Sequence, residues 1–474
     1  MSDASRMILG LIIGIGLMIF LVMKTKVHTF IALLLAALVT GLIGGMPIND
    51  VVSGSKKTVG VISAIQDGFG STLKSTGIII GLGVMMGGIL EASGAAERLA
   101  FTFIKRLGQK HIDWALAITG WVVAIPVFAD SAIVIFAPLV KALSSVTGIS
   151  VVGLALALAC GLQLTHCLVP PTPGPLTAAG MLGVDVGQMI FVGALVSIPM
   201  LIIVMFYVKS IGKKIYQLPL ENGEFERRDF KKEYIRTMDE VESVMDTKKL
   251  PAFGASIAPI IVPILLIFVK TFWDMYKKGN TSVAGSIPDT LISLLGAPIV
   301  ALGIGTILAI YGLVGSVDKK KVLGIMDLAI KDTGAIMLIT GAGGSLGNVI
   351  KVAGIGDVLG NAIAATPLPA ILIPFIIAAC MRLALGSATV AITTAASISA
   401  GLIGTISVSP LLMAISSCVG AISFSYFNDS GFWVFNGMFG LSELKDQVRC
   451  KTAVSLIMAA VGIVELLLMG LFIR

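Results

Sequence analysis

Long apolar runs separated by short polar loops dominate the pattern of the chain. Runs of about twenty apolar residues recur along it, which is the length that an α-helix needs to cross the hydrocarbon core of a bilayer. The sequence therefore predicts an all-α polytopic membrane protein. We expect crossing helices at about 7–23, 27–46, 76–95, 150–183, 188–208, 251–272, 288–314, 332–350, 408–440 and 452–473.

Two of these spans are too long for straight helices, and each contains a break. VPPTPGP (169–175) interrupts the first and FNDSG (427–431) the second. Prolines lack an amide hydrogen and clash with the preceding turn, so this proline cluster cannot lie inside a regular helix. Two further apolar stretches, 113–142 and 367–400, have polar residues at their centres. We predict that both enter the membrane and return as re-entrant hairpins.

The composition agrees with a membrane protein, and the distribution of charges predicts its orientation in the membrane. Only 13% of the 474 residues are charged, about half the share of a soluble domain, so a soluble enzyme is not expected. If both termini lie outside, the short cationic loops fall on the cytoplasmic side, as the positive-inside rule requires. The basic clusters are Lys24/Lys26, Lys105/Arg106/Lys110, 209–249, Lys319–Lys321 and Lys445/Arg449/Lys451. The segment 209–250 is then a cytoplasmic linker.

The two parts of the chain that flank this linker resemble each other. GGILEASGAAERLA (87–100) matches GNVIKVAGIGDVLG (347–360), DSAIV (130–134) matches GSATV (386–390), and TPGPL (172–176) matches DSGFW (429–433), in order and at nearly constant spacing. Residues 1–208 and 251–474 each have five predicted crossings, so the second part enters the membrane from the opposite side. Such inverted-topology repeats are typical of secondary transporters, with substrate held near the midplane by broken helices.

Three of these motifs resemble one known family. HCLVPPTPGPL (166–176), FNDSGFW (427–433) and GWVVAIPVFADSAIVIFAPL (120–139) are similar to segments of the gluconate permease (GntP) family of the ion transporter superfamily. The resemblance implies a proton-coupled importer of gluconate or a related sugar acid, with D-serine as the main alternative substrate. It also implies a homodimer in the bacterial inner membrane that works by an elevator-type motion.

A sugar acid needs positive partial charge for its carboxylate and hydrogen-bond partners for its hydroxyls. Helix N-termini at the breaks and hairpin tips supply unpaired amides and a favourable dipole. The N-cap-rich sequences GSAT (386–389) and NDSG (428–431) begin such helices. We therefore expect substrate contacts from Ser131, Thr172, Gly174, Ser387, Thr389, Asn428 and Ser430, although these groups could instead cap their own helices.

The predicted spans and hairpins place four ionisable residues at membrane depth, namely Asp130, His166, Arg382 and Asp429. Asp130 and Asp429 occupy related positions in the two halves, and an unpaired carboxylate there needs a partner, a proton or a function. Either could couple transport to protons, and the stronger capping context of Asp429 favours Asp130. Arg382 could bind the substrate carboxylate, pair with an aspartate or snorkel to the interface. His166 could relay protons or be structural.

Other functional classes fit the sequence less well. A passive channel would not need paired breaks and hairpins, and a membrane enzyme would need clustered catalytic groups or metal ligands, whereas the three histidines are scattered. GAGGSLG (341–347) lacks the lysine of a phosphate-binding loop and is typical of close helix packing. We therefore predict symport of a hydroxy-acid anion with protons, without any cofactor or metal.

Overall fold

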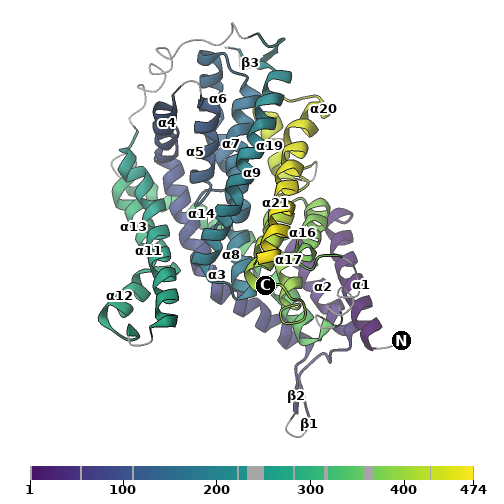
Figure 1. Ribbon diagram of the computed structural model, residues 1–474. Helices are drawn as coiled ribbons and strands as arrows, with labels where there is room; N and C mark the ends of the chain where they lie inside the picture. The colour runs from purple at the N-terminus through teal and green to yellow at the C-terminus, as the bar shows by residue number, and fades with distance from the viewer. Residues whose placement is uncertain are drawn as a thin grey trace.

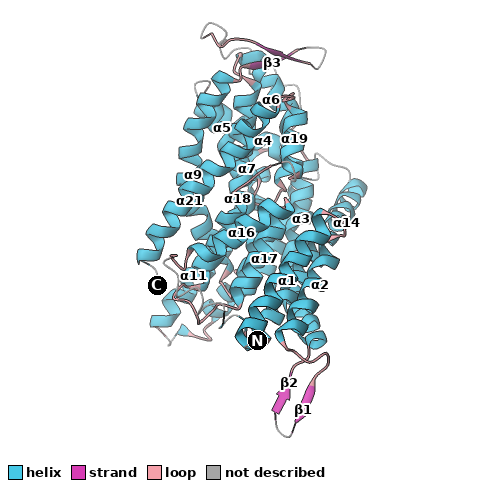
Figure 2. Cartoon of the chain, turned by 90° about the vertical axis from the view of Figure 1, so that its right-hand side faces the viewer, coloured by secondary structure: helices cyan, strands magenta, loops and turns pink. Residues whose placement is uncertain are grey.

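The computed structural model describes a nearly all-helical chain, elongated in one direction (Figure 1). The termini lie toward one end, and the β3–β4 hairpin lies at the other (Figures 1 and 2). The residues that the structure describes are 3–53, 56–108, 111–220, 224–231, 250–280, 283–313, 319–355, 358, 368–426 and 429–472.

In its described residues, the first part of the chain forms nine α-helices and two short hairpins. Its helices are α1 (Asp3–Met23), α2 (Thr29–Gly44), α3 (Val61–Ala92), α4 (Ala95–Leu107), α5 (Ile112–Val123), α6 (Ala129–Thr147), α7 (Val151–Leu168), α8 (Pro173–Leu182) and α9 (Val186–Lys214). The antiparallel strands β1 (Val51–Ser53) and β2 (Lys56–Thr58) join α2 to α3, and β3 (Gln217–Pro219) pairs with β4 (Phe225–Arg227) after α9.

The second part of the chain is also helical. Its helices are α11 (Phe253–Gly279), α12 (Ile287–Leu295), α13 (Pro298–Leu313), α14 (Lys319–Val352), α16 (Leu372–Leu385), α17 (Ala388–Ala400), α18 (Pro410–Ile422), α19 (Ser430–Met438), α20 (Leu444–Gln447), the π-helical turn η5 (Val448–Thr452) and α21 (Ala453–Phe472).

Seven of the described helices are long and apolar enough to cross a membrane, or eight if the bent pair α12–α13 counts as one span. The sequence predicted ten crossings. Three predicted crossings are not among these spans: α2 has only 16 residues, the range 332–350 within α14 is not a candidate span, and the range 408–440 is divided into the short helices α18 and α19. In the range predicted for the first hairpin, α6 alone reaches 19 residues and satisfies the criterion for a span.

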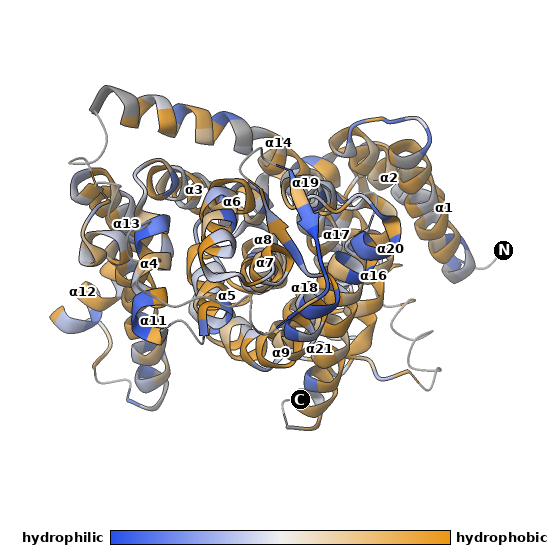
Figure 3. Ribbon diagram, turned by 90° about the horizontal axis from the view of Figure 1, so that it is seen from above, coloured by the Kyte–Doolittle hydropathy of each residue, from blue (hydrophilic) through white to orange (hydrophobic). Residues whose placement is uncertain are grey.

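The helices on either side of the first break form the centre of the molecule. Viewed from above, α7 and α8 are surrounded by other helices, while α1–α2 and α11–α13 lie at opposite edges (Figure 3). α7 is almost entirely buried, because small and apolar residues occupy all of its faces. Gly161 of α7 allows the closest approach: a Cβ atom added there would lie 2.0 Å from the carbonyl oxygen of Ala117 on α5.

Small residues also join the two parts of the chain at α3 and α14. A Cβ atom added at Gly344 would lie 2.0 Å from Oγ1 of Thr72 and 2.6 Å from the carbonyl oxygen of Gly68. This contact confirms the helix-packing interpretation of GAGGSLG. α3 begins at Val61, earlier than the predicted start at 76, because its polar first half packs against α14, where Ser345 and Asn348 donate to its backbone carbonyls.

The beginning of the predicted linker is docked on the helices. α9 continues to Lys214, and β3 then contacts α6 and α7. The Tyr216 hydroxyl donates to the carbonyl of Gly148, and Nε2 of Gln217 donates to that of Phe439 at 3.0 Å. Arg227 forms an ion pair with Asp446. These contacts tie Tyr216, Gln217 and Arg227 to both parts of the chain. Residues 232–249 lie outside the described part.

Candidate functional site

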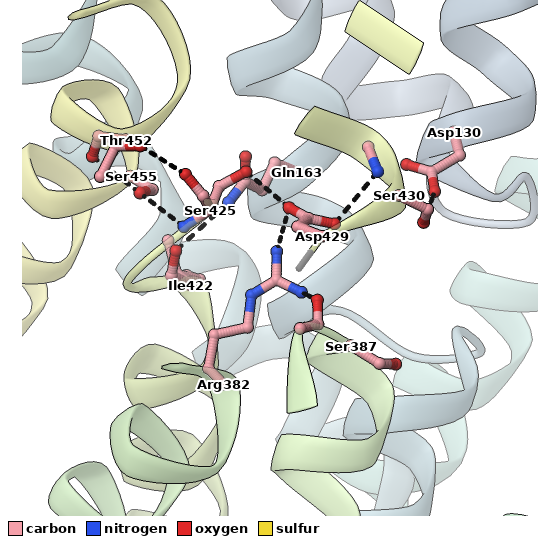
Figure 4. A network of polar contacts seen from close by, with 12 residues as sticks. Asp130, Gln163, Arg382, Ser387, Ile422, Ser425, Asp429, Ser430, Thr452 and Ser455 are labelled. Carbon is pink, nitrogen blue, oxygen red and sulfur yellow. Dashed lines mark hydrogen bonds and ion pairs between the residues drawn. The ribbon is translucent and has the colours of Figure 1, made fainter. Parts of the chain in front are cut away.

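A polar pocket lies where α6, α17 and α19 begin, and α7, α16 and η5 pass beside it. Its volume is about 430 Å³, enough for a small organic anion. The polar and charged residues that line it come from both parts of the chain. They are Asp130, Gln163, His166, Arg382, Ser387, Thr389, Asp429, Ser430 and Lys451. Figure 4 shows most of them converging.

Arg382 and Asp429 form a buried ion pair in this pocket. Arg382 lies in the last turn of α16, and Asp429 is the N-cap of α19. Their residues are 4% and 7% exposed, and Nη2 of Arg382 lies 2.5 Å from Oδ2 of Asp429. Nη1 of the same guanidinium donates to the carbonyl of Gly386, where α16 ends in a left-handed conformation (φ 79°). The pair therefore joins the first arm of the second predicted hairpin to the second helix break.

Further hydrogen bonds complete the surroundings of the Asp429 carboxylate. The hydroxyl of Ser425 donates to Oδ2 at 2.5 Å, and the amide of Gly431 donates to Oδ1 at 3.1 Å (Figure 4). The backbone of Ser425 is itself held by Thr452 and Ser455, the residues that follow Lys451. Asp429 is thus paired with a cation and caps its helix, so both of its oxygens have partners.

Asp130 lies in different surroundings across the pocket. It belongs to the first turn of α6 and is partly buried. The hydroxyl of Ser430 donates to its Oδ2 at 2.7 Å. Gly431 permits this approach, because a Cβ atom there would lie 2.6 Å from Oδ1 of Asp130. Among the residues that the structure describes, no cation lies within ion-pair distance of Asp130.

Two helix N-termini open into the same pocket. Ser387 is the N-cap of α17, and its hydroxyl accepts a hydrogen bond of 3.4 Å from the amide of Val390. Thr389 lies in the first turn and also lines the pocket. α19 begins at Ser430 on the other side. Helix N-termini carry positive partial charge and unpaired amides, so this arrangement suits an anion or a group of hydroxyls.

Polar residues of α7 form one wall. His166 is partly buried, its ring lies 5.9 Å from that of Phe128, and its Nδ1 has no hydrogen-bond partner in the described structure. Gln163, one turn earlier, donates from Nε2 to the carbonyl of Ile422 at 3.2 Å. The sequence analysis did not select Gln163. An amide in the apolar run before the proline break was the signal that could have identified it.

Four residues predicted to contact substrate are not among the pocket residues. The hydroxyl of Thr172 donates to the carbonyl of Val169 at 2.6 Å, so it stabilises the turn at the proline break. Gly174 packs against α17, where an added Cβ atom would lie 2.7 Å from Cδ1 of Ile392. Ser131 is exposed on α6. Asn428 lies outside the described residues. Substrate contact by these four therefore stays a prediction.

Lys451 is the charged pocket residue that the sequence analysis placed elsewhere. We expected it in a cytoplasmic loop with Lys445 and Arg449. In the structure, α20, η5 and α21 form one continuous helix from Leu444, and Lys451 lies in its π-helical turn, 5% exposed. The extra residue of a π-turn alters the direction in which side chains point. Lys445 and Arg449 are exposed, whereas Lys451 lines the pocket.

Comparison with known proteins covers the whole chain. The family model described as GntP family permease matches residues 6–472. An uncharacterized permease of Haemophilus influenzae is 42% identical over 98% of this chain and 92% of its own length. A gluconate permease of Pseudomonas aeruginosa is 32% identical over 99% of both chains, and a high-affinity gluconate transporter of Escherichia coli is 31% identical over 97% of this chain and 98% of its own.

Two solved structures share the fold. The structure of Neisseria gonorrhoeae MtrF, described as representing a class of antimetabolite efflux pumps, aligns with a TM-score of 0.65 over 96% of this chain and 97% of its own, at 14% identity. The Alcanivorax borkumensis YdaH transporter aligns with a TM-score of 0.62 over 94% and 97%, at 12% identity. At this level of identity the likeness concerns the fold alone.

Proposed function

Because the chain belongs to the GntP family of permeases, we propose that it imports gluconate or a related sugar acid together with protons across the bacterial inner membrane. It is a multi-pass membrane transporter and not an enzyme. Gluconate is named for several of its relatives, which supports a sugar acid as the substrate class. The pocket between the two parts of the chain, with its carboxylates, cations and helix N-termini, is the proposed binding site.

The different surroundings of Asp130 and Asp429 support the proposal that transport is coupled to protons. Asp429 has a cation and two hydrogen-bond donors, whereas Asp130 has a hydroxyl donor and no ion pair within the described structure. A carboxylate in a pocket at membrane depth is stabilised when it takes up a proton. Asp130 is therefore the proposed proton-coupling residue, which agrees with the preference from the sequence. His166, on the adjacent wall, could pass protons to it.

Helix packing supports the proposed inverted repeat and its moving part. α8 follows the first break and packs against α17 of the second part, while α19 follows the second break and packs against α6 of the first part. A pseudo-twofold relation between the halves would generate this reciprocal pairing. We propose that these four helices, with α5, α7, α16 and α18, form the part that carries substrate in an elevator-type motion. The homodimer is a further proposal.

The number of protons transported with each anion determines whether transport responds to the membrane potential. One proton with one monovalent anion is electroneutral and gains nothing from the membrane potential. A second proton would make the cycle electrogenic and add about 2.3 kcal/mol per 100 mV. A gradient of one pH unit is worth about 1.4 kcal/mol per proton and supports about tenfold accumulation. The reversal potential therefore reports the stoichiometry.

Uptake into proteoliposomes tests the proposal. We expect labelled D-gluconate to accumulate when the outside is made acidic, and to equilibrate only when a protonophore removes the gradient. Replacing sodium by choline should leave this uptake unchanged. Uptake that follows a sodium gradient and ignores an imposed pH gradient would refute proton coupling.

D-serine is the second candidate substrate, and the charges of the pocket give a reason to test it. A zwitterion needs a partner for its ammonium group, and Asp130 has no cation in the described structure. Competition with labelled D-gluconate uptake distinguishes the candidates. Under the main proposal, unlabelled D-gluconate and other aldonates compete and D-serine does not.

A further inference from the structure

We propose that Lys451 binds the carboxylate of the transported anion. This inference rests on the proposed function, because it assigns one contact within the same pocket. Lys451 lines the pocket and is 5% exposed, and no carboxylate lies within ion-pair distance of its ammonium group in the part of the chain that the structure describes. A buried ammonium group without a carboxylate partner is costly, so it indicates an anion that is bound in the working cycle.

The other cation of the pocket is already engaged. Arg382 donates from Nη2 to Asp429 and from Nη1 to the carbonyl of Gly386. A substrate carboxylate that approached this guanidinium would have to displace the Asp429 carboxylate, which also caps α19 and accepts from Ser425. Lys451 imposes no such displacement, and an ammonium group offers three donors.

In the described structure, the contacts that hold Lys451 in place leave the three N–H donors of its ammonium group unused. Its Nζ lies 5.4 Å from the centre of the Phe435 ring, a cation–π contact that stabilises the charge when the pocket is empty. The hydroxyl of Thr452 donates to the carbonyl of Ser425 at 2.7 Å, and the hydroxyl of Ser455 accepts from the amide of Ser425 at 3.1 Å (Figure 4). The helix that bears Lys451 is thereby fixed to the segment that leads to Asp429.

This assignment explains why an anion and a proton would enter together. The pocket contains two carboxylates, Asp130 and Asp429, and two cations, Arg382 and Lys451. Asp429 and Arg382 neutralise each other. When a substrate carboxylate neutralises Lys451, Asp130 is left as an uncompensated negative charge, and a proton on Asp130 restores neutrality. Loading of one anion with one proton leaves the net charge of the pocket unchanged.

Kinetic constants of Lys451 variants in proteoliposomes test the assignment. We expect Lys451→Met, which keeps the unbranched stem of the side chain but removes the ammonium group, to raise the KM for D-gluconate by at least about tenfold, equivalent to about 1.4 kcal/mol. The matched control is Arg449→Met, because Arg449 lies in the same π-turn but is exposed. Its KM should stay within about twofold of the wild type, about 0.4 kcal/mol.

Chemical rescue separates charge from structure. Lys451→Cys, made in a Cys380→Ser background because Cys380 is the exposed native thiol, is treated with 2-bromoethylamine, which forms a thioether analogue of lysine. We expect the treatment to lower the raised KM toward the wild-type value, and treatment with iodoacetamide, which adds no charge, to leave it raised. The unfolding temperatures of the variants should match that of the wild type.

Three outcomes would overturn the assignment. A KM for Lys451→Met within about twofold of the wild type refutes it, and so does a raised KM that both reagents leave unchanged. In either case the proposed function stands if the wild type still accumulates D-gluconate. If the wild type accumulates D-serine instead, the same variants are measured with D-serine, whose carboxylate would make the same contact. If it accumulates neither, the proposed function and this inference are both wrong.

Discussion

Two aspartates at related positions in the two halves lie in opposite electrostatic surroundings. Asp429 caps α19 and pairs with Arg382, whereas Asp130 receives a single hydroxyl hydrogen bond from Ser430. The first carboxylate is paired with a cation, and the second has no cation within ion-pair distance in the described structure. We therefore propose different roles for the two aspartates, a structural role for Asp429 and a coupling role for Asp130.

Substitution of Asp130 should separate coupling from binding. Asp130→Asn keeps the shape of the side chain and can still accept from Ser430, so the fold should be retained. We expect this variant to exchange labelled for unlabelled D-gluconate by counterflow but to lose accumulation under a pH gradient, because the amide cannot carry the coupled proton. Uptake assays of both kinds provide the measurement. Full accumulation by Asp130→Asn would assign coupling to another group.

Substitution of Asp429 should instead affect stability. Asp429→Asn leaves the guanidinium of Arg382 buried without its counter-charge, and breaking a buried ion pair by removing one partner costs about 3–5 kcal/mol. We expect a clearly lower unfolding temperature in detergent for Asp429→Asn than for Asp130→Asn, measured side by side. Equal unfolding temperatures for the two variants would show that the ion pair contributes little to stability.

At the scale of elements, helix termini and interruptions form the site. α17 and α19 begin at the pocket, the proline break ends α7 one turn after His166, and the π-turn η5 directs Lys451 inward. Each interruption requires neighbours that approach closely, because broken helices leave backbone groups to be satisfied by the surrounding structure. Glycines allow close helix approach elsewhere in the molecule, at Gly161 of α7 against α5 and at Gly344 of α14 against α3.

The contact of α5 with α7 gives a prediction at this scale. A Cβ atom at Gly161 would lie 2.0 Å from the carbonyl oxygen of Ala117, so Gly161→Ala must push the two helices apart. We expect a loss of about 1–3 kcal/mol, the usual cost of overpacking, and a lower unfolding temperature. Gly81→Ala is the control, because no atom lies within 4 Å of a Cβ atom at that position of α3. Unchanged stability of Gly161→Ala would show that α5 and α7 can separate freely.

The pattern of the sequence predicted the class of the whole molecule and much of its site. Hydrophobic periodicity showed helical spans, and prolines and N-cap residues showed where helices are interrupted. Asp130, His166, Arg382, Ser387, Thr389, Asp429 and Ser430 were selected in this way and lie together around one pocket. Whether they bind substrate or protons stays a prediction.

Other features could not be read from the pattern, for physical reasons. Lys451 follows Lys445 and Arg449, and the spacing of these charges alone predicts that all three lie in an exposed loop. Its inward direction depends on the π-turn, which has no sequence signal. The polar first half of α3 has low hydropathy, yet it is helical because α14 covers it.

The reciprocal packing of α8 on α17 and of α19 on α6 has a consequence for biosynthesis. During translation the first half leaves the ribosome before its partners exist, although chains commonly fold from the N-terminus onward. The faces of α6 and α8 that pack against α19 and α17 therefore stay uncovered until those helices have been inserted, and the last of these ends only at Met438. The pocket is completed late, so we expect a nascent chain that stalls earlier to expose polar helix ends to lipid and to become a target for quality-control proteolysis.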